Sequence, residues 1–437
     1  MQKNPVELRQ SIGLWGVVSL GLGTAVGVSI FSAIAPSAGL AGPAMLLSVL
    51  VAALPMYLIA VSYAFLGSVV PVSGASFVWP ARFLHPALGF FIAWMRIVAN
   101  MGAMVVLALV LVRYVSMLVP VPEKPAMFAV LVLALLANLF GVRSAARTQT
   151  VMIALLIALF AAFVVWGSFT VEPGNFEPFA PRGASGVLAA APLLMGLFFG
   201  LEAATEAGGE IADSRRSIPL GIALSIGTAT VLYLAVSFVA LGILGSSGLA
   251  ASEAPILDAA QAFMGPVAVL VVVLAAVVAI GTSLNAIFTL FSRSLMAMGQ
   301  AGVLPQAFAR VHPRWRVPHI ALLAVFALGC VGLFLPMELT FLFLAVNIPN
   351  LVKYGSICLA AAKVARNHPD IYEAASFRPS RGRMIALGNI GAACAAALVF
   401  TGLEADWRPY GLLLVWAGVG GIWYTLRRNG SRGAAES

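Results

Sequence analysis

The sequence predicts an all-α integral membrane protein with twelve transmembrane helices, and two observations support this fold class. Of the 437 residues, 61% are hydrophobic and only 9% are charged, whereas soluble domains contain about 25% charged residues. The chain also holds twelve apolar stretches near the length of about 20 residues that a helix needs to cross a bilayer. A water-soluble globular protein is therefore excluded.

The twelve predicted spans follow one another with short connections. Their approximate bounds are residues 12–36, 42–69, 86–118, 125–142, 147–170, 186–212, 218–245, 264–299, 318–336, 339–363, 384–402 and 409–426. The longest connections, 171–185 and 368–383, are too short to form a separate soluble domain. We therefore expect a single membrane domain over residues 1–437, with a polar tail at 427–437.

The net charge of +9 is explained by membrane topology. An even number of spans places both termini on one side. That side carries most of the Lys and Arg residues, among them Arg82, Arg293 and Arg427, and the other side keeps only Arg113, Lys124, Arg182 and Arg408. The positive-inside rule then predicts a multi-pass protein of the cytoplasmic membrane with both termini in the cytoplasm. The expected partner of the basic residues is the lipid bilayer, and no nucleic acid is expected.

Two predicted spans contain small residues near the middle of the bilayer. Segment 21–31 reads GLGTAVGVSIF, and segment 198–206 reads FFGLEAATE. The first is compatible with close helix packing through Gly23 and Gly27, or with an unwound stretch whose peptide groups line a polar cavity. The second favours unwinding, because its glycine stands beside carboxylates at the same depth.

Two interrupted spans five helices apart are typical of an inverted repeat of five helices. We therefore expect one repeat over residues 12–170 and an inverted repeat over 186–363. Two further helices, within 384–426, would complete the domain.

Four groups of motifs resemble the amino acid, polyamine and organocation (APC) transporters, which have the leucine-transporter-type fold. They are residues 21–31; 41–44 with 71–76; 199–205 running on to 215–219; and 283–286 followed by 292–293, 296–305 and 311–313. The chain departs from the family at Ser29, where glycine is usual, at Gly209 and Glu210, and at Asp213 and Ser214. The resemblance covers nearly the whole chain and implies a secondary carrier that works by alternating access.

The two breaks offer opposite poles to a zwitterionic amino acid. Free amides at the start of the second half of the first broken span favour a carboxylate. Carbonyl groups near Thr24, Phe198 and Phe199 can accept hydrogen bonds from an ammonium group. The small Gly196 leaves room for a substrate side chain, and Phe198 and Phe199 are either an aromatic lid or packing residues. The predicted substrate-binding residues are Thr24, Gly27, Val28, Ser29, Gly196, Phe198, Phe199, Gly200, Leu201 and Glu202.

Glu202 and Glu206 are the candidate gating or proton-linked acids, together with Arg96. Their i to i+4 spacing places both acids on one face of the half-helix after the second break, and two like charges there are unfavourable. At least one is then protonated part of the time. Either a backbone hydrogen bond seals a neutral Glu, or the acids act as a proton-responsive gate or bind an ammonium group. The resemblance links Glu202 to proton sensing. Arg96 would pair with an acid or with the substrate.

No resident cofactor is expected, and the candidate coupling ions are Na⁺ and H⁺. Some family members carry a lysine in span five, and its ammonium group takes the place of sodium. Leu156 stands at the matching position here. Resemblance to sodium-coupled symporters implies a sodium site formed by carbonyls of Gly23, Val26 and Ala279 and hydroxyls of Thr282 and Ser283. Such hydroxyls often bond to the carbonyl four residues earlier instead, so sodium-independent exchange and proton coupling stay open. Asn285, Asn347 and Asn350 are expected to hydrogen-bond between helices.

A neutral amino acid is the preferred substrate, because the two acids, Glu202 and Glu206, have one possible internal partner in Arg96. An antiporter of cationic amino acids or polyamines is the alternative, and a channel is a remote one. An enzyme is not expected. The four histidines lie at span ends or in loops, and the sequence contains neither HExxH nor a phosphate-binding GxxxxGK[ST] motif. The three cysteines lie in apolar stretches and indicate neither disulfides nor a metal cluster.

Overall fold

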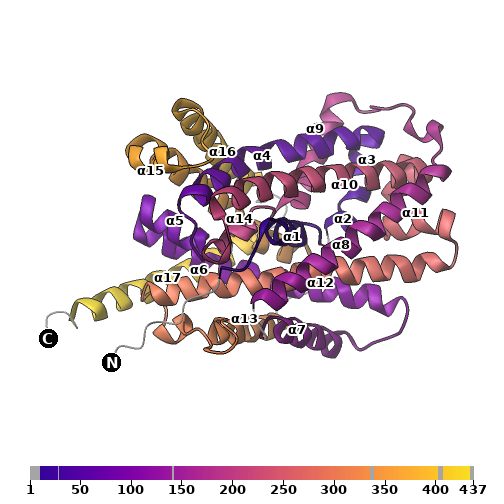
Figure 1. The fold of residues 1–437 in the computed structure, drawn as a ribbon. Coiled ribbons are helices and arrows are strands. Elements are labelled where there is room, and N and C mark those ends of the chain that lie inside the picture. Colours follow the sequence, from indigo (N-terminus) through magenta and orange to yellow (C-terminus); the bar gives the residue numbers. More distant parts are fainter. Residues whose placement is uncertain (1–9, 28, 140–141, 335–338, 402–406, 434–437) are drawn as a thin grey trace.

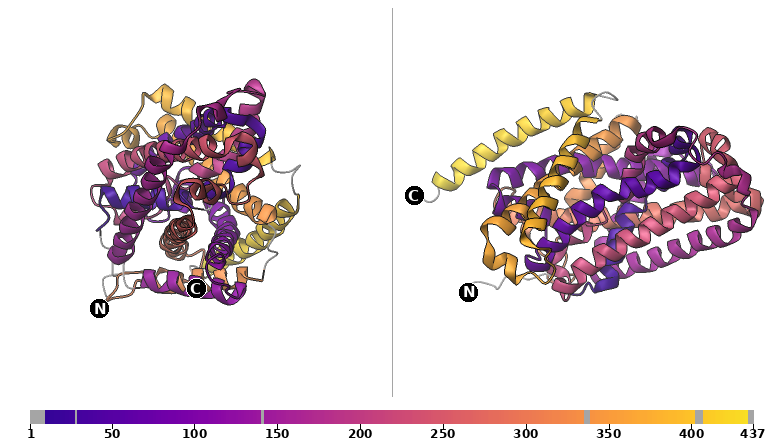
Figure 2. Two further views of the ribbon diagram at one scale, coloured as in Figure 1. Left: turned by 90° about the vertical axis from the view of Figure 1, so that its right-hand side faces the viewer. Right: turned by 90° about the horizontal axis from the view of Figure 1, so that it is seen from above.

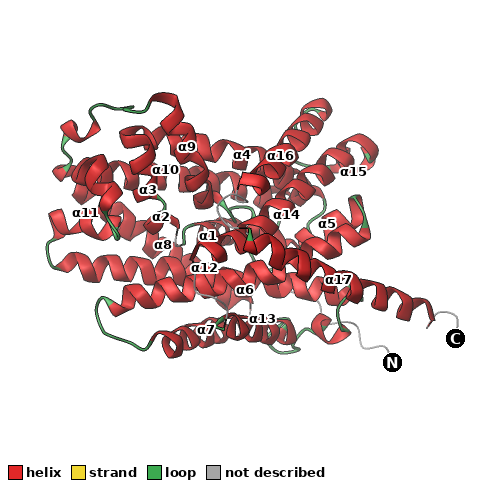
Figure 3. Cartoon of the chain, turned by 180° about the vertical axis from the view of Figure 1, so that it is seen from behind, coloured by secondary structure: helices red, strands yellow, loops and turns green. Residues whose placement is uncertain are grey.

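The computed structural model describes residues 10–27, 29–139, 142–334, 339–401 and 407–433. All the regular secondary structure within these ranges consists of helices, as Figures 1 and 3 show. Nine helical segments in these ranges are long and apolar enough to cross a membrane, and two shorter apolar helices accompany them. The all-α, multi-span class is thus confirmed, while the layout of twelve spans stays a prediction.

The helices of the first part of the chain are α1 (Leu14–Ala25), α2 (Ser29–Ser32), α3 (Ile34–Ala41), α4 (Met45–Val69), α5 (Ala75–Phe83), α6 (Pro86–Ser116), α7 (Glu123–Leu139) and α8 (Val142–Gly167). Those of the second part are α9 (Gly183–Met195), α10 (Ser214–Ala251), α11 (Pro255–Met264), α12 (Val267–Gln300), α13 (His319–Gly332), α14 (Leu339–Asn367), α15 (Pro369–Ala374), α16 (Arg381–Thr401) and α17 (Arg408–Gly433).

The long helices run roughly along one axis and surround α1 (Figures 1 and 2). Helix α1 contacts α8, α10 and α12, and α14 packs against α4, α6 and α16. The far half of α17 leaves the bundle at the end that also holds α5 and α15, whereas α11 lies at the opposite end (Figure 1). This arrangement places α1 and its break inside the protein.

The first predicted break is present in the structure. Helix α1 ends at Ala25, and Val26 follows with φ −81° and ψ 71°, outside the helical region. Helix α2 begins at Ser29. Val28, one of the predicted substrate-binding residues, lies outside the described residues. The glycine-rich stretch therefore interrupts the span where the sequence predicted it.

The second break is longer than predicted. Helix α9 ends at Met195, a 3₁₀ turn follows, and Phe199 is extended with ψ 129°. Gly200 has φ +97°, a conformation that is strongly disfavoured for every residue except glycine. Only short 3₁₀ turns, Ala203–Glu206 and Gly208–Glu210, connect this point to α10. The expected α-helical half-helix is absent from this segment, so the expectation that Glu202 and Glu206 share a helix face is wrong.

Candidate functional site

The two breaks meet at a cavity of about 180 Å³. Seven of the predicted substrate-binding residues line it, namely Thr24, Gly27, Ser29, Gly196, Phe199, Gly200 and Glu202. The Ser29 hydroxyl donates a hydrogen bond of 3.3 Å to the Gly196 carbonyl and so joins one break to the other. Seven residues predicted at the two breaks therefore lie on the wall of one cavity.

Two other predicted residues have packing roles. Phe198 is buried, and its ring meets the ring of Tyr233 edge-on at 5.6 Å. Leu201 is also buried, and a Cβ built at Gly21 would lie 2.6 Å from the Leu201 carbonyl oxygen. Of the two phenylalanines considered as a lid, Phe199 is thus the one at the cavity.

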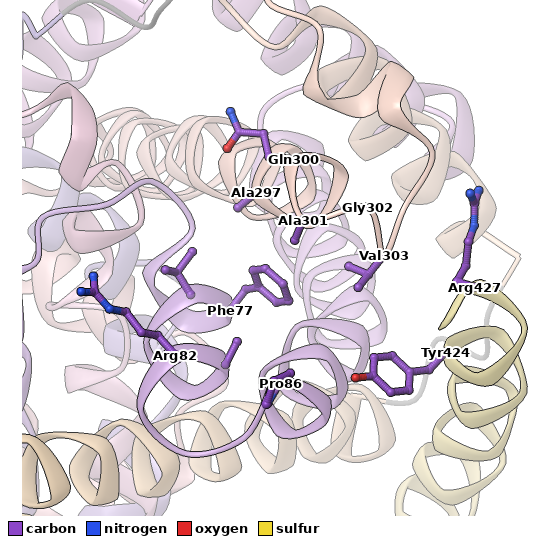
Figure 4. Close-up of a pocket in the computed structure, with 12 residues that line it drawn as sticks. Phe77, Arg82, Pro86, Ala297, Gln300, Ala301, Gly302, Val303, Tyr424 and Arg427 are labelled. Atoms are coloured by element: carbon purple, nitrogen blue, oxygen red, sulfur yellow. The ribbon is translucent and has the colours of Figure 1, made fainter. Parts of the chain in front are cut away.

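A larger cavity of about 690 Å³ lies between α5, α6, α17 and the end of α12. Figure 4 shows Arg82 and Arg427 on two opposite sides of it, with Phe77 and Tyr424 between them. Both arginines are exposed, and neither break contributes to its lining. Binding sites for small solutes combine apolar walls with a few converging buried polar groups. The smaller cavity fits this description, and it is the candidate site.

Glu202 forms a buried ion pair at the cavity. Its Oε1 lies 2.9 Å from Nζ of Lys353, which α14 supplies, and both residues line the cavity. The amide of Gly200 donates a hydrogen bond of 3.0 Å to the hydroxyl of Tyr354, the next residue of α14. Sequence reasoning missed this partner of Glu202, although Lys353 lies in the middle of the predicted span 339–363 and could have been considered.

Glu206 has a different partner. Its Oε1 lies 2.7 Å from Nη1 of Arg96 in α6, and its Oε2 accepts a hydrogen bond of 3.4 Å from the amide of Ser76 in α5. Arg96 also donates to the Ser76 hydroxyl. Arg96 thus neutralises one of the two acids, as one of its predicted roles required, and its side chain also lines the cavity.

A third ion pair lies further along the second break. Arg293 of α12 binds Glu210 through two contacts, Nε to Oε1 at 2.7 Å and Nη2 to Oε2 at 3.3 Å. Both side chains are almost completely buried. The Glu210 carbonyl accepts hydrogen bonds from the amides of Ser11 and Ile12. Arg293 is therefore an internal residue that helps to connect the end of the break, the N-terminal segment and α12.

The candidate sodium-binding residues of α1 and α12 also meet. The Ser283 hydroxyl donates to the Gly23 carbonyl at 2.7 Å and to the Ala279 carbonyl at 3.2 Å. The Thr282 hydroxyl donates to the Ala279 carbonyl at 2.6 Å. Oxygen donors of this kind suit a hard cation, and in this structure the two hydroxyls donate to these carbonyls. Val26 is buried and directly follows the last residue of α1.

A buried glutamine that the sequence reasoning did not consider lies beside this set. Gln149 of α8 donates from Nε2 to the Ser19 carbonyl at 3.2 Å, and a Cβ at Gly23 would lie 1.7 Å from the same nitrogen. Leu156, on the same helix, is buried and apolar. The polar group that α8 brings to α1 is thus an uncharged amide.

Gln149 belongs to a chain of buried side chains that connects α8, α12 and α7. Asn285 Nδ2 donates to Gln149 Oε1 at 2.7 Å, and Asn138 Nδ2 donates to Asn285 Oδ1 at 2.9 Å. The predicted interhelical role of Asn285 is confirmed. Asn347 and Asn350, by contrast, line the cavity, and Asn350 donates to the Val346 carbonyl of its own helix.

Comparison with known proteins agrees with this architecture. Residues 12–416 match the family described as amino acid permease. An uncharacterized transporter of Mycobacterium tuberculosis is 32% identical, with 74% of this chain and 73% of that protein covered. The methylthioribose transporter of Bacillus subtilis is 29% identical, with 86% and 85% covered. The branched-chain amino acid permease BcaP of Bacillus subtilis is 26% identical, with 96% and 93% covered.

The match to this family covers nearly the whole chain, and the relatives are transporters, not enzymes. The fold agrees, because several helices are apolar enough to cross a membrane. The chain therefore belongs to the amino acid permease family of the APC transporters and is a multi-pass membrane transporter for a small molecule.

Proposed function

We propose that the protein is a secondary carrier of a neutral amino acid, which it moves across the cytoplasmic membrane by alternating access. The observation that supports this most is the cavity between the two breaks, where Glu202 is already neutralised by Lys353. A zwitterion adds no net charge to such a site. The relation to a branched-chain amino acid permease supports the same substrate class.

The peptide groups at the breaks supply the poles that a zwitterion needs. Ser29 begins α2 and lines the cavity, so its amide stands at the start of a helix and favours a carboxylate. The amide of Gly27, by contrast, donates to the Ala25 carbonyl at the end of α1. The backbone carbonyls at the end of α1, near Thr24, are suited to an ammonium group. The substrate would thus bind mainly to backbone.

The proposed topology has twelve spans, arranged as two inverted repeats of five helices followed by two further helices. Both termini would lie in the cytoplasm. The distribution of charge supports this orientation, because α5 and the far half of α17, which carry Arg82 and Arg427, lie at the end of the bundle opposite α11 (Figure 1).

A thermal-shift screen of the purified protein against amino acids and polyamines tests the substrate class. We expect leucine-like neutral amino acids to raise the melting temperature, because ligand binding to the folded state stabilises it. In proteoliposomes the same compounds should show trans-stimulated counterflow, which a channel cannot produce. Stabilisation by diamines or arginine alone would instead favour the cationic antiporter.

We further propose that transport is independent of sodium. The hydroxyls of Thr282 and Ser283 donate to carbonyls that sodium would need, and the Gln149 amide adds a donor at the same junction. We expect equal uptake when potassium replaces sodium, and sodium-independent uptake that persists in the double variant Thr282→Ala/Ser283→Ala. Sodium-dependent uptake that this variant abolishes would establish the sodium site. Uptake that follows an imposed pH gradient would identify proton coupling.

A further inference from the structure

We propose that Lys353 determines the charge selectivity of the cavity: its ammonium group binds the Glu202 carboxylate and thereby excludes cationic substrates. This inference rests on the proposed function and names the group that would enforce the preference for neutral substrates. Lys353 and Glu202 come from different elements, α14 and the second break, and meet at the cavity wall.

The pair is built into the protein interior. Lys353 Nζ lies 2.9 Å from Glu202 Oε1, and the two side chains are 5% and 3% exposed. A lone charge at membrane depth is strongly unfavourable. Each residue therefore stabilises the charged form of the other.

Aromatic rings hold the ammonium group in place from other sides. Lys353 Nζ lies 4.2 Å from the centre of the Tyr354 ring and 6.0 Å from that of Tyr63. Both distances are within the range of cation–π attraction. Because the Tyr354 hydroxyl also accepts a hydrogen bond from the Gly200 amide, the position of the lysine is linked to the second break.

The charged groups around the cavity then sum to zero. Arg96 is paired with Glu206, and Lys353 is paired with Glu202. A substrate with an additional positive charge would meet only carboxylates that already have a cationic partner. Glu202 Oε2 is buried and makes no hydrogen bond in the described part of the chain, although Tyr354 is close enough to interact with the carboxylate. Without Lys353, this carboxylate becomes the natural partner of an ammonium or guanidinium group.

The test compares Lys353→Gln with wild type in proteoliposomes. The measurement is the ratio of half-inhibitory concentrations with which lysine and leucine compete for uptake of a labelled neutral amino acid. We expect the ratio to fall at least tenfold in favour of lysine. Lys353→Arg keeps the charge and should keep wild-type selectivity. The double variant Glu202→Gln/Lys353→Gln removes both charges and should also prefer leucine, which a purely structural role of Lys353 does not predict.

Glu202→Gln provides an independent second variant if Lys353→Gln does not fold. It leaves the Lys353 ammonium without its carboxylate, so competition by glutamate should increase at least tenfold relative to leucine. An unchanged charge preference in the folded variants would overturn the role of Lys353, while the proposed function stands. If wild type binds no neutral amino acid at all, the proposed function fails first.

Discussion

Replacing Glu210 with glutamine is expected to destabilise the folded protein by about 3 to 5 kcal/mol, the range for removing one partner of a buried ion pair. Arg293 is 1% exposed, and its side chain is a guanidinium group. In the variant it would lose the carboxylate that it contacts at 2.7 and 3.3 Å. Backbone bonds from Ser11 and Ile12 to the carbonyl of residue 210 would remain, so the effect isolates the side-chain charge.

Thermal and denaturant unfolding of the purified protein in detergent measures this effect. Glu253→Gln is the matched control, because Glu253 is exposed and the same change there should leave stability within about 0.5 kcal/mol. The double variant Glu210→Gln/Arg293→Met should be more stable than Glu210→Gln, since it removes the uncompensated charge. Equal stability of the variants at 210 and 253 would contradict a buried ion pair.

The sequence was sufficient to predict the all-α fold class and the positions of the two breaks. Hydropathy identifies apolar helices without reference to packing, and glycine at mid-depth marks where the backbone leaves the helix. For this reason most of the residues predicted at the breaks, such as Thr24, Gly27 and Gly200, line one cavity. Both breaks were predicted from patterns within single segments.

Side-chain partners were harder to predict, because they depend on how helices far apart in the chain pack. Lys353 stands 151 residues from Glu202, and Gln149 stands 130 residues from Ser19. Spacing within one segment contains no information on such pairs. The position of Lys353 in the middle of an apolar span was the available signal for that residue, and for Gln149 the sequence offered no comparable one.

The conformation after the second break was also decided by packing. The spacing of Glu202 and Glu206 assumed an α-helix, whereas the backbone there bonds to other segments. The Glu206 carbonyl accepts the Gly74 amide, and a Cβ at Gly208 would lie 2.7 Å from the Val72 carbonyl oxygen. This close approach of backbones replaces the hydrogen bonds of a helix and directs the two acids to different partners.

Substituting Gly200 with alanine is expected to abolish measurable transport, and Gly196→Ala is its matched control in the same cavity. Gly200 has φ +97°, and a Cβ there would lie 2.5 Å from Cγ2 and 2.9 Å from Cβ of Thr24. Alanine would therefore combine backbone strain of about 1 to 3 kcal/mol with a steric clash between the two breaks. At Gly196 the nearest atom to a Cβ is the Ser29 hydroxyl oxygen, at 3.7 Å, which is an ordinary contact.

Both alanine variants add one methyl group to the wall of the cavity, so a difference between them reports the backbone at Gly200 and not the volume of the site. We expect Gly196→Ala to fold and to transport, with a weaker apparent affinity for large side chains. Gly200→Ala should lose counterflow and the stabilisation by substrate, even where size-exclusion chromatography shows folded protein. If Gly200→Ala retains transport at the level of Gly196→Ala, the second break does not need its left-handed residue, and the contact between the breaks at Thr24 would not be required for binding.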